Sequence, residues 1–391
     1  QVSAGDRRGE EGEVEMEASG ARALQLLRDG STSALAGLEA LDLREAGATE
    51  LSILAGALPR CLALSRLDLG SGAALLREEH GALAKAVAGL PHLEILFAAG
   101  ADLAEVPPVL AHCKQLKLVG FRDNRLEALD GRLLPEGLVW LIATGNPIRE
   151  LPDVVCLQRI RKLMLSHCQL TSQALAPIAG LLSLEMLRAA SNRLEAFPEA
   201  LLRHPRLAWV AVGGNPFSEK ALKSLLDAAP AAAVDFTEVS LGERLGSGAG
   251  ATVYAAEWRG RRVAVKLWTT DRFSDGTALE EWAVNRVAAV PGHPALVGVL
   301  GAFQAPHLGM ILELLENAKA AAGPPSFASV TRDTLPASGR DQALFTAASA
   351  MRTAKAVASA LAYLHGRGLM HGDVYLHNTL LVQGEEPAEA R

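Results

Sequence analysis

Hydrophobic and polar positions recur at a fixed spacing through the first half of the chain. Apolar residues stand at positions 1, 4, 6 and 11 of a short pattern, and Asn stands at position 9. The pattern fits residues 116–126, 138–148, 184–194 and 207–217. Looser copies start at Leu38, Leu64, Leu93 and Ile160, so successive copies begin 22 to 29 residues apart. Self-similarity of this period predicts a solenoid, in which each copy stacks on its neighbours.

The pattern is similar to the leucine-rich repeat, whose template reads LxxLxLxxNxL. Its apolar positions would stack into one continuous core. The Asn position is held by Asn124, Asn146, Asn192 and Asn215, and by Cys168 in one looser copy. Side-chain amides there can bond the backbone of the turns along the stack. An irregular leucine-rich helical domain would not explain Asn at one fixed offset.

From residue 236 onward the hydrophobic pattern changes. Residues 252–266 carry Val, Tyr and Trp and break at Arg259-Gly260, which predicts two strands joined by a hairpin turn. A glycine-rich stretch, residues 246–253, precedes them, and Lys266 ends the run Val-Ala-Val-Lys. The N–H groups of a glycine-rich turn can lie against phosphate oxygens, and a lysine on the next strand but one can reach the same phosphates.

A third group of polar residues lies much further along the chain. Asp373 follows His371-Gly372, and Asn378 stands five residues after the Asp. At that spacing in one loop, an Asp can serve a substrate hydroxyl and an Asn can serve a metal. Together with Lys266 and the glycine-rich turn, this order predicts phosphoryl transfer. A bare flexible turn would leave the later residues unexplained.

Two other glycine-rich loops fit the chain poorly. A Walker A loop requires Lys directly after its last Gly and then Ser or Thr, whereas Ala251-Thr252 follows Gly250. A Rossmann turn opens a helix and is followed about 20 residues later by an acidic residue. Here strands follow the turn and position 266 is Lys.

Residues 236–391 resemble the first half of a protein kinase domain. The kinase pattern GxGxxGxV is present with Ala251 as its third member, because Gly250 falls one place early, and residues 263–266 match the V-A-I-K strand. Residues 311–315 look like the fifth strand entering the hinge, and residues 354–371 look like a buried helix leading into the catalytic loop.

The resemblance implies ATP and Mg²⁺ and assigns a role to each matching residue. Asp373 would accept the hydrogen bond of the substrate hydroxyl, Lys266 would position the α- and β-phosphates, and Asn378 would help to hold Mg²⁺. Glu280 and Glu281 both qualify as the helix glutamate that pairs with Lys266. The remaining nucleotide contacts would be Gly246, Ser247, Gly248, Ala249, Gly250 and Ala251 at the phosphates, Val253 and Ala264 on adenine, and the backbone of Glu313 and Leu315 at the hinge.

Three departures from the kinase pattern affect the expected activity. Gly372 replaces the Arg that pairs with an activation-loop phosphate, so we expect little dependence on phosphorylation of that loop. Tyr375 replaces the phosphate-binding Lys of Ser/Thr kinases, which leaves the acceptor residue open. No Asp-Phe-Gly precedes Arg391. We therefore interpret the sequence as a fragment, and expect weak or undetectable ATP binding and no phosphotransfer from these 391 residues alone.

Composition sets the organisation and excludes some classes of function. We expect an α/β chain with an acidic disordered segment over 1–20, a solenoid of about eight repeats over 21–217, a linker over 218–235 and a kinase-like α+β domain over 236–391. The net charge of -6 argues against a nucleic-acid surface. No apolar run is long enough to span a membrane, so we expect a cytoplasmic protein. The four cysteines lack CxxC spacing and are expected to be buried thiols.

Two functions compete at this stage. One is a soluble protein kinase whose repeats recruit a substrate or regulator, and the other is a non-catalytic scaffold built from the repeats and a pseudokinase. In the repeat template the third and fifth residues point away from the core, because strand side chains alternate. We therefore expect an exposed apolar stripe that binds a protein partner, or the chain's own kinase lobe, across Trp140 and Trp209. Its other members would be Ile95, Phe97, Leu118, Ile142, Met164 and Met186.

Overall fold

The computed structural model describes residues 17–78, 80–228, 234–248, 250–335, 345–382 and 389–390. The chain forms two compact units. The first comprises Gln1–Ala208 with Ser326–Thr331, and the second comprises Trp209–Pro325 with Arg332–Arg391. The expectations for residues 1–16, residues 229–233 of the linker, and Ala249 fall outside the described residues.

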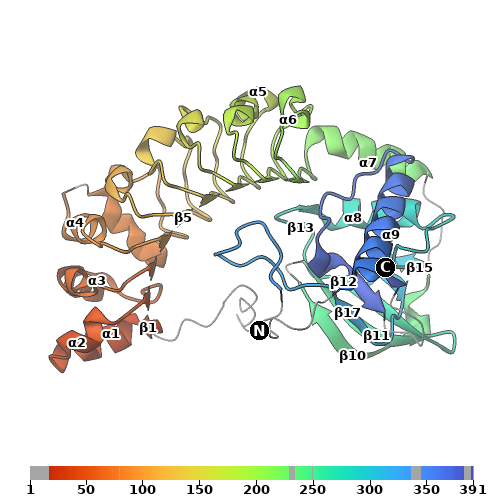
Figure 1. Ribbon diagram of the computed structural model, residues 1–391, viewed down its shortest axis with the longest axis horizontal. Helices are drawn as coiled ribbons and strands as arrows, with labels where there is room; N and C mark the ends of the chain where they lie inside the picture. The colour runs from red at the N-terminus through yellow and green to blue at the C-terminus, as the bar shows by residue number, and fades with distance from the viewer. Residues whose placement is uncertain are drawn as a thin grey trace. The chain divides into compact units, whose positions relative to one another are not determined.

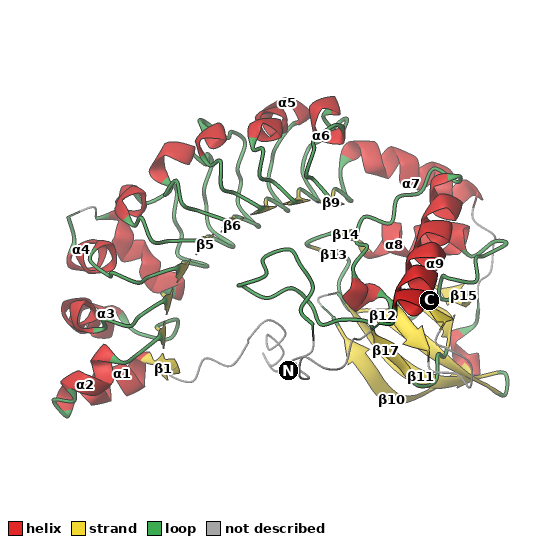
Figure 2. Cartoon of the chain, viewed as in Figure 1, coloured by secondary structure: helices red, strands yellow, loops and turns green. Residues whose placement is uncertain are grey.

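The first unit is a solenoid of short parallel strands. Eight strands pair in chain order, and each is in register with the next. Strands line the inner side of the arc in Figure 1, and Figure 2 shows helices and loops on its outer side. The strands are β1 (Glu17–Ser19), β2 (Ala40–Asp42), β3 (Arg66–Asp68), β4 (Ile95–Phe97), β5 (Leu118–Gly120), β6 (Trp140–Ile142), β7 (Lys162–Met164) and β8 (Met186–Arg188).

The returns between strands contain α-helices at both ends of the solenoid and mostly short 3-10 helices in its middle. The α-helices are α1 (Gly20–Arg28), α2 (Thr32–Ala36), α3 (Ala48–Ala57), α4 (Ala82–Ala88), α5 (Ser172–Leu175) and α6 (Glu199–Leu202). The 3-10 helices are η1 (Leu58–Arg60), η2 (Gly70–Arg77), η3 (Pro108–His112), η4 (Gly131–Leu133), η5 (Val154–Cys156) and η6 (Ala176–Gly180).

The central residue of each strand from β2 to β8 enters the core, as the repeat register predicts. Leu141, Leu163 and Leu187 are fully buried and lie opposite one another on successive strands. Their neighbours Trp140 and Ile142 therefore point to the other face of the sheet. The leucine-rich-repeat fold and its register are thus confirmed.

The buried asparagines form the predicted ladder. The Asn146 Nδ2 donates to the carbonyl oxygens of Phe121 and Ala143 at 2.8 and 3.0 Å, and its Oδ1 accepts from Leu126 N at 3.0 Å. The side chains of Asn124 and Asn192 make equivalent hydrogen bonds to backbone groups of the preceding repeat. Each amide thus satisfies backbone groups of two adjacent turns, which the sheet itself cannot reach.

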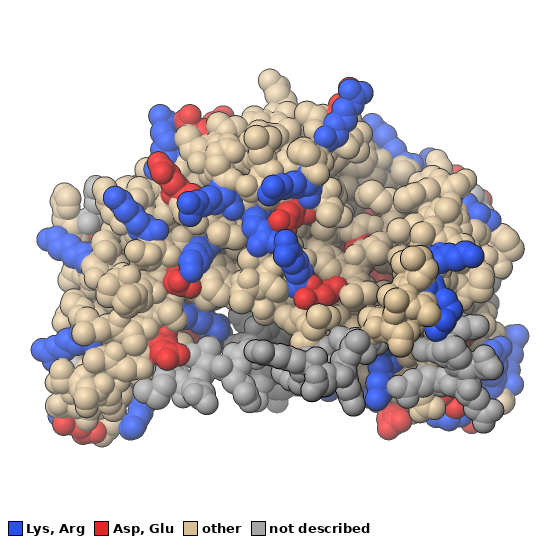
Figure 3. Space-filling view, viewed as in Figure 1, with Lys and Arg blue, Asp and Glu red and all other residues tan. Residues whose placement is uncertain are grey.

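Ion pairs join neighbouring repeats at the surface. Lys117 Nζ lies 2.5 Å from Glu94 Oε1, and Arg161 Nη2 lies 2.7 Å from Glu185 Oε2. Basic and acidic side chains are accordingly interspersed on the face shown in Figure 3. Exposed pairs of this kind contribute about 0–1 kcal/mol each, so the core and the asparagine ladder determine the fold.

The apolar stripe on the strands is not exposed as the sequence predicted. Trp140 and Trp209 are each only 7% exposed. The Lys162 ammonium lies 3.6 Å from the centre of the Trp140 ring, whose Nε1 donates to the Met164 sulfur at 3.4 Å. Trp209 packs instead against Tyr375. Side chains of the chain itself thus cover both indoles, and the binding of a partner across this face stays a prediction.

The second unit has a five-stranded antiparallel sheet in the order β10-β11-β12-β16-β15. The hairpin at Arg259-Gly260 joins β11 to β12, as predicted. The elements are β9 (Trp209–Ala211), α7 (Pro216–Ala228), η7 (Phe236–Glu238), β10 (Val239–Ser247), β11 (Ala251–Trp258), β12 (Arg261–Trp268), β13 (Arg272–Phe273), β14 (Gly276–Thr277), α8 (Ala278–Ala288), β15 (Val299–Phe303), β16 (Gly309–Glu313), β17 (Ala318–Ala320), α9 (Ala347–His365), η8 (Leu376–Asn378), β18 (Leu380–Val382) and β19 (Glu389–Ala390). Within the described ranges, no helix is both long and apolar enough to cross a bilayer.

The linker and the cysteines differ in part from expectation. Helix α7 covers the start of the segment expected to be a linker, while the domain boundaries themselves stay a prediction. Cys61, Cys113 and Cys168 are buried thiols, as expected, but Cys156 is exposed. Cys156 ends η5, whose inward position is taken by Val154. The prediction that all four thiols are buried is therefore wrong for Cys156.

Candidate functional site

Lys266 and Glu281 form an ion pair between β12 and α8. The indole Nε1 of Trp268 also donates to Glu281 Oε2 at 3.0 Å and holds the carboxylate in place. Glu280 has a different role, because together with Thr277 it forms the capping box that begins α8. The structure therefore selects Glu281 as the partner of Lys266.

The glycine-rich turn joins β10 to β11. Gly246 lies opposite Val253, and Gly248 N donates to Ala251 O at 2.9 Å. A Cβ built on Gly246 or Gly248 would meet no other described atom within 4 Å, so packing within the described chain does not require glycine at either position. At Gly250, in contrast, a Cβ would lie 2.8 Å from the Phe273 ring. The first two glycines thus leave the backbone open to a close ligand, which fits phosphate binding.

The loop after α9 brings Asp373 and Asn378 together. Asn378 Nδ2 donates to Asp373 Oδ2 at 2.7 Å and to the Asp373 carbonyl oxygen at 3.1 Å. The other carboxylate oxygen, Asp373 Oδ1, is buried and has no hydrogen-bond partner among the described residues. An unsatisfied buried acceptor costs about 1–3 kcal/mol, so a donor from a substrate is the natural partner for this atom.

The Lys266–Glu281 pair and the Asp373–Asn378 pair lie at one cavity of about 1080 Å³. Lys266, Glu281, Asp373 and Asn378 all line it. The described part of the glycine-rich turn, Val253, Ala264, Glu313 and Leu315 do not line this cavity. The structure thus brings the four charged or polar site residues together and leaves the predicted adenine contacts outside that space.

The predicted adenine contacts lie on the sheet and at its edge. Ala264 is buried and pairs with Leu312 across β12 and β16, whereas Val253 is half-buried. The N–H of Glu313 donates to Gly298 O at 2.8 Å. Its carbonyl oxygen, which has two lone pairs, is therefore the backbone group that Glu313 could offer to a ligand.

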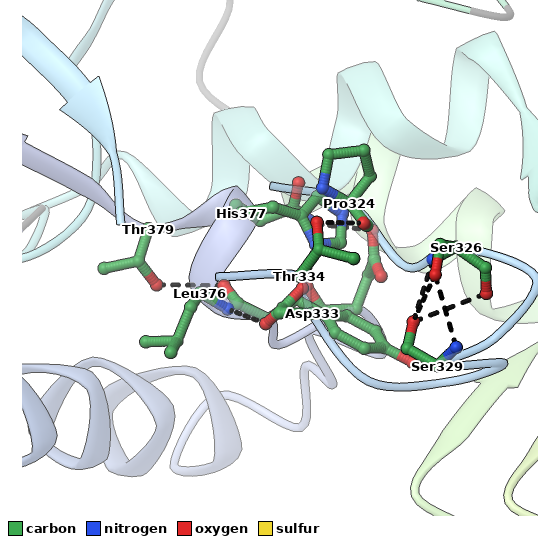
Figure 4. A network of polar contacts seen from close by, with 11 residues as sticks. Pro324, Ser326, Ser329, Asp333, Thr334, Leu376, His377 and Thr379 are labelled. Atoms are coloured by element: carbon green, nitrogen blue, oxygen red, sulfur yellow. Dashed lines mark hydrogen bonds and ion pairs between the residues drawn. The ribbon is translucent and has the colours of Figure 1, made fainter. Parts of the chain in front are cut away.

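Asp333 supports the loop that carries Asp373 and Asn378, and sequence reasoning missed it. Its Oδ2 accepts from Leu376 N at 2.7 Å, and its Oδ1 lies 2.5 Å from His377 Nδ1. Thr334 beside it donates to Pro324 O at 2.8 Å, and Figure 4 shows these contacts around η8. No motif marks Asp333, because it lies more than 40 residues before its partners in a segment without a repeated pattern.

The residues present fit a nucleotide and a cation only in part. Lys266, Asp373 and the open glycine backbone suit phosphate and hydroxyl groups. Because the amide nitrogen of Asn378 is bonded to Asp373, its oxygen is the atom that could face Mg²⁺. In the part of the chain that the structure describes, no three His, Cys, Asp or Glu side chains gather as a metal site. A cation would therefore depend on Asn378 and on phosphate oxygens.

Comparisons with known proteins agree with this geometry. The sequence profile of the protein kinase domain family matches residues 239–387. A 110-residue segment is 34% identical to a probable serine/threonine-protein kinase, SIS8, from Arabidopsis thaliana, and covers 26% of this chain and 11% of that protein. A 159-residue segment is 33% identical to mitogen-activated protein kinase kinase kinase 7 from Drosophila melanogaster, and covers 40% of this chain and 21% of that protein.

A solved structure resembles the other half of the chain. Internalin C2 from Listeria monocytogenes aligns over 47% of this chain and 75% of its own, with a TM-score of 0.38 and 18% identity. The parallel sheet and the asparagine ladder, rather than this match, identify the leucine-rich-repeat solenoid. The chain thus combines this solenoid with a segment, residues 239–387, that matches the protein kinase domain family.

Proposed function

We propose that the chain is an ATP-dependent protein kinase that transfers a phosphoryl group to a protein hydroxyl. The observation that supports this most strongly is that the Lys266–Glu281 pair and the Asp373–Asn378 pair line the same cavity. The match to the kinase domain family agrees with it. The solenoid would serve as a protein-interaction module. A cytoplasmic location is part of this proposal, and the four free cysteine thiols fit a reducing compartment.

Lys266 would bind the α- and β-phosphates of ATP. Glu281 holds its ammonium at the cavity, so that little reorganisation is needed when phosphate arrives. The backbone N–H groups of Gly246 and Gly248 would contact further phosphate oxygens. Mg²⁺, when bound, would neutralise charge between the phosphates, and Asn378 would help to hold it.

Asp373 would orient the acceptor hydroxyl. Its Oδ2 is held by Asn378, so the carboxylate cannot turn away without breaking that bond. The unpartnered Oδ1 would then accept a hydrogen bond from the substrate hydroxyl while the hydroxyl oxygen attacks the transferred phosphoryl group. Positioning of this kind supplies most of the catalysis in phosphoryl transfer, because little covalent chemistry is left to the protein.

A non-catalytic scaffold is the second candidate, and one contact favours it. Tyr375 occupies the place of the phosphate-binding Lys, and its ring lies 4.8 Å from the Trp209 ring in an edge-on arrangement. An aromatic side chain held in this way cannot supply the missing positive charge. If nucleotide binding fails, the catalytic loop would serve as a docking surface rather than as an active site.

Nucleotide binding distinguishes the two candidates. The complete gene product that contains these residues is titrated with MgATP in a calorimeter, and the parent is expected to bind. Lys266→Met should weaken the affinity about 10- to 100-fold, because a hydrogen bond to a charged group contributes about 1.5–3 kcal/mol. Lys319→Met is the matched control, since Lys319 is exposed on β17 and does not line the cavity. A parent protein that binds no nucleotide, or a Lys266→Met variant that binds like the control, would contradict the proposal.

A further inference from the structure

Residues 209–228, which comprise β9 and α7, belong to the second compact unit. By sequence, residues 207–217 are the last copy of the leucine-rich repeat. The turn between β9 and α7 contains Gly213 and Gly214. This segment lies against two elements that carry candidate site residues, α8 with Glu281 and the loop of Asp373.

The glycine turn is bonded to the beginning of α8. Gly214 N donates to Glu280 Oε1 at 2.9 Å. The other oxygen of the same carboxylate accepts from Thr277 N at 3.2 Å and from Thr277 Oγ1 at 3.0 Å. A Cβ on Gly213 would lie 2.5 Å from Glu280 Oε2 and 2.8 Å from Gly276 Cα. Glu280 therefore links the start of α8 to the turn between β9 and α7. That turn can lie this close to Glu280 only because Gly213 has no side chain.

Strand β9 is in contact with the catalytic loop. The ring centres of Trp209 and Tyr375 lie 4.8 Å apart at an interplanar angle of 65°, which is a favourable edge-to-face arrangement. The carbonyl oxygen of Val210 would lie 3.2 Å from a Cβ on Gly372, and Gly372 has a φ of +76°. Glycine at position 372 thus fits both the positive φ of the backbone there and the close contact with β9.

Helix α7 completes the contact. Leu222 and Leu226 stand one turn apart and pack against the cluster that contains Trp268, Trp282 and Met310. Leu222 also lines the cavity that holds Lys266 and Glu281. The segment therefore forms part of the wall of the candidate site.

We propose that residues 209–228 act as a clamp that positions α8 and the catalytic loop against the same cavity. Glu281 follows Glu280 directly, so a fixed start of α8 fixes the carboxylate that pairs with Lys266. Trp209 in turn fixes Tyr375, two residues from Asp373. Gly213 and Trp209 are thus positioning residues, and their role in catalysis rests on the proposed kinase function.

Hydrogen–deuterium exchange on the complete gene product tests the clamp without requiring activity. Gly213→Leu should speed exchange of the α8 amides about tenfold or more, because the new side chain displaces Glu280. Trp209→Leu should do the same for residues 371–378. Trp209→Phe should restore protection there, since a ring is retained. Gly56→Leu is the control for added bulk, because Gly56 is exposed and has no described atom within 4 Å of its Cβ position.

The outcomes separate the clamp from the kinase proposal. Faster exchange in Gly213→Leu and Trp209→Leu, with rescue by Trp209→Phe and normal exchange in Gly56→Leu, supports the clamp. Unchanged exchange in both variants overturns it, as does equal loss of protection with Leu and Phe at position 209. If Gly213→Leu does not fold, the pair of Trp209 variants decides. A parent that binds no nucleotide, while its variants still lose protection, supports the clamp and removes the kinase function.

Discussion

At the scale of single residues, burial and immediate neighbours decide the chemistry. The sequence left Glu280 and Glu281 as equal candidates for Lys266. Their roles separate only through the position of the helix start: Glu280 caps α8 with Thr277, and Glu281 is left to pair with Lys266. The sequence does hold a signal for this choice, because Thr277 stands three residues before Glu280, which is the spacing of a capping box.

The thiols provide a test at this scale. Burial raises the pKa of Cys113 and of Cys168 to about 11, whereas Cys156 is exposed. At pH 8 only ~0.1% of a thiol with such a pKa is thiolate, the reactive form. Iodoacetamide at pH 8 should therefore label Cys156 first in the folded protein, and label Cys113 and Cys168 only after denaturation. Mass spectrometry of the labelled peptides measures this, and early labelling at Cys168 would show that the repeat core is open to solvent.

At the scale of elements, the repeat pattern predicted the features that depend on the alternation of side chains along a strand. The leucines at strand centres are buried and the asparagines bond the turns, because both follow from a strand period of two and a fixed turn. The environment of Trp140 could not be predicted, since its burial depends on the reach of the Lys162 and Met164 side chains from the next strand. The contacts of Asp333 with η8 were equally hidden, because they join distant segments.

The asparagine ladder gives the prediction for this scale. Asn146→Ala should lower the free energy of unfolding by about 2–4 kcal/mol, because it leaves buried backbone groups of two turns without partners. Gln158 is exposed, and its side-chain amide donates hydrogen bonds to the carbonyl oxygens of Val155 and Gly180. Gln158→Ala, which removes these hydrogen bonds, should lower the free energy of unfolding by less than about 1 kcal/mol. Urea denaturation of each variant measures the difference. Equal costs for the two substitutions would mean that the ladder does not stabilise the solenoid.

At the scale of the whole molecule, the sequence predicted two modules, and the boundary between them stays a prediction. The repeat template continues to residue 217, whereas compact packing begins a new unit at Trp209. The difference arises because a repeat copy is defined by its own leucines, while Trp209 and Gly214 are engaged by Tyr375 and Glu280. The last repeat copy is therefore also a structural part of the kinase-like unit.

The central claim is that this unit transfers phosphate through Asp373. The most direct measurement is the rate of MgATP-dependent phosphorylation by the complete gene product, compared with Asp373→Asn and with the exposed control Lys319→Met. Loss of a positioned general base should lower the rate about 10²- to 10⁴-fold, with the thermal midpoint unchanged. The control should keep the parental rate. An Asp373→Asn variant that transfers phosphate as fast as the parent, or a parent without measurable transfer, would contradict the account.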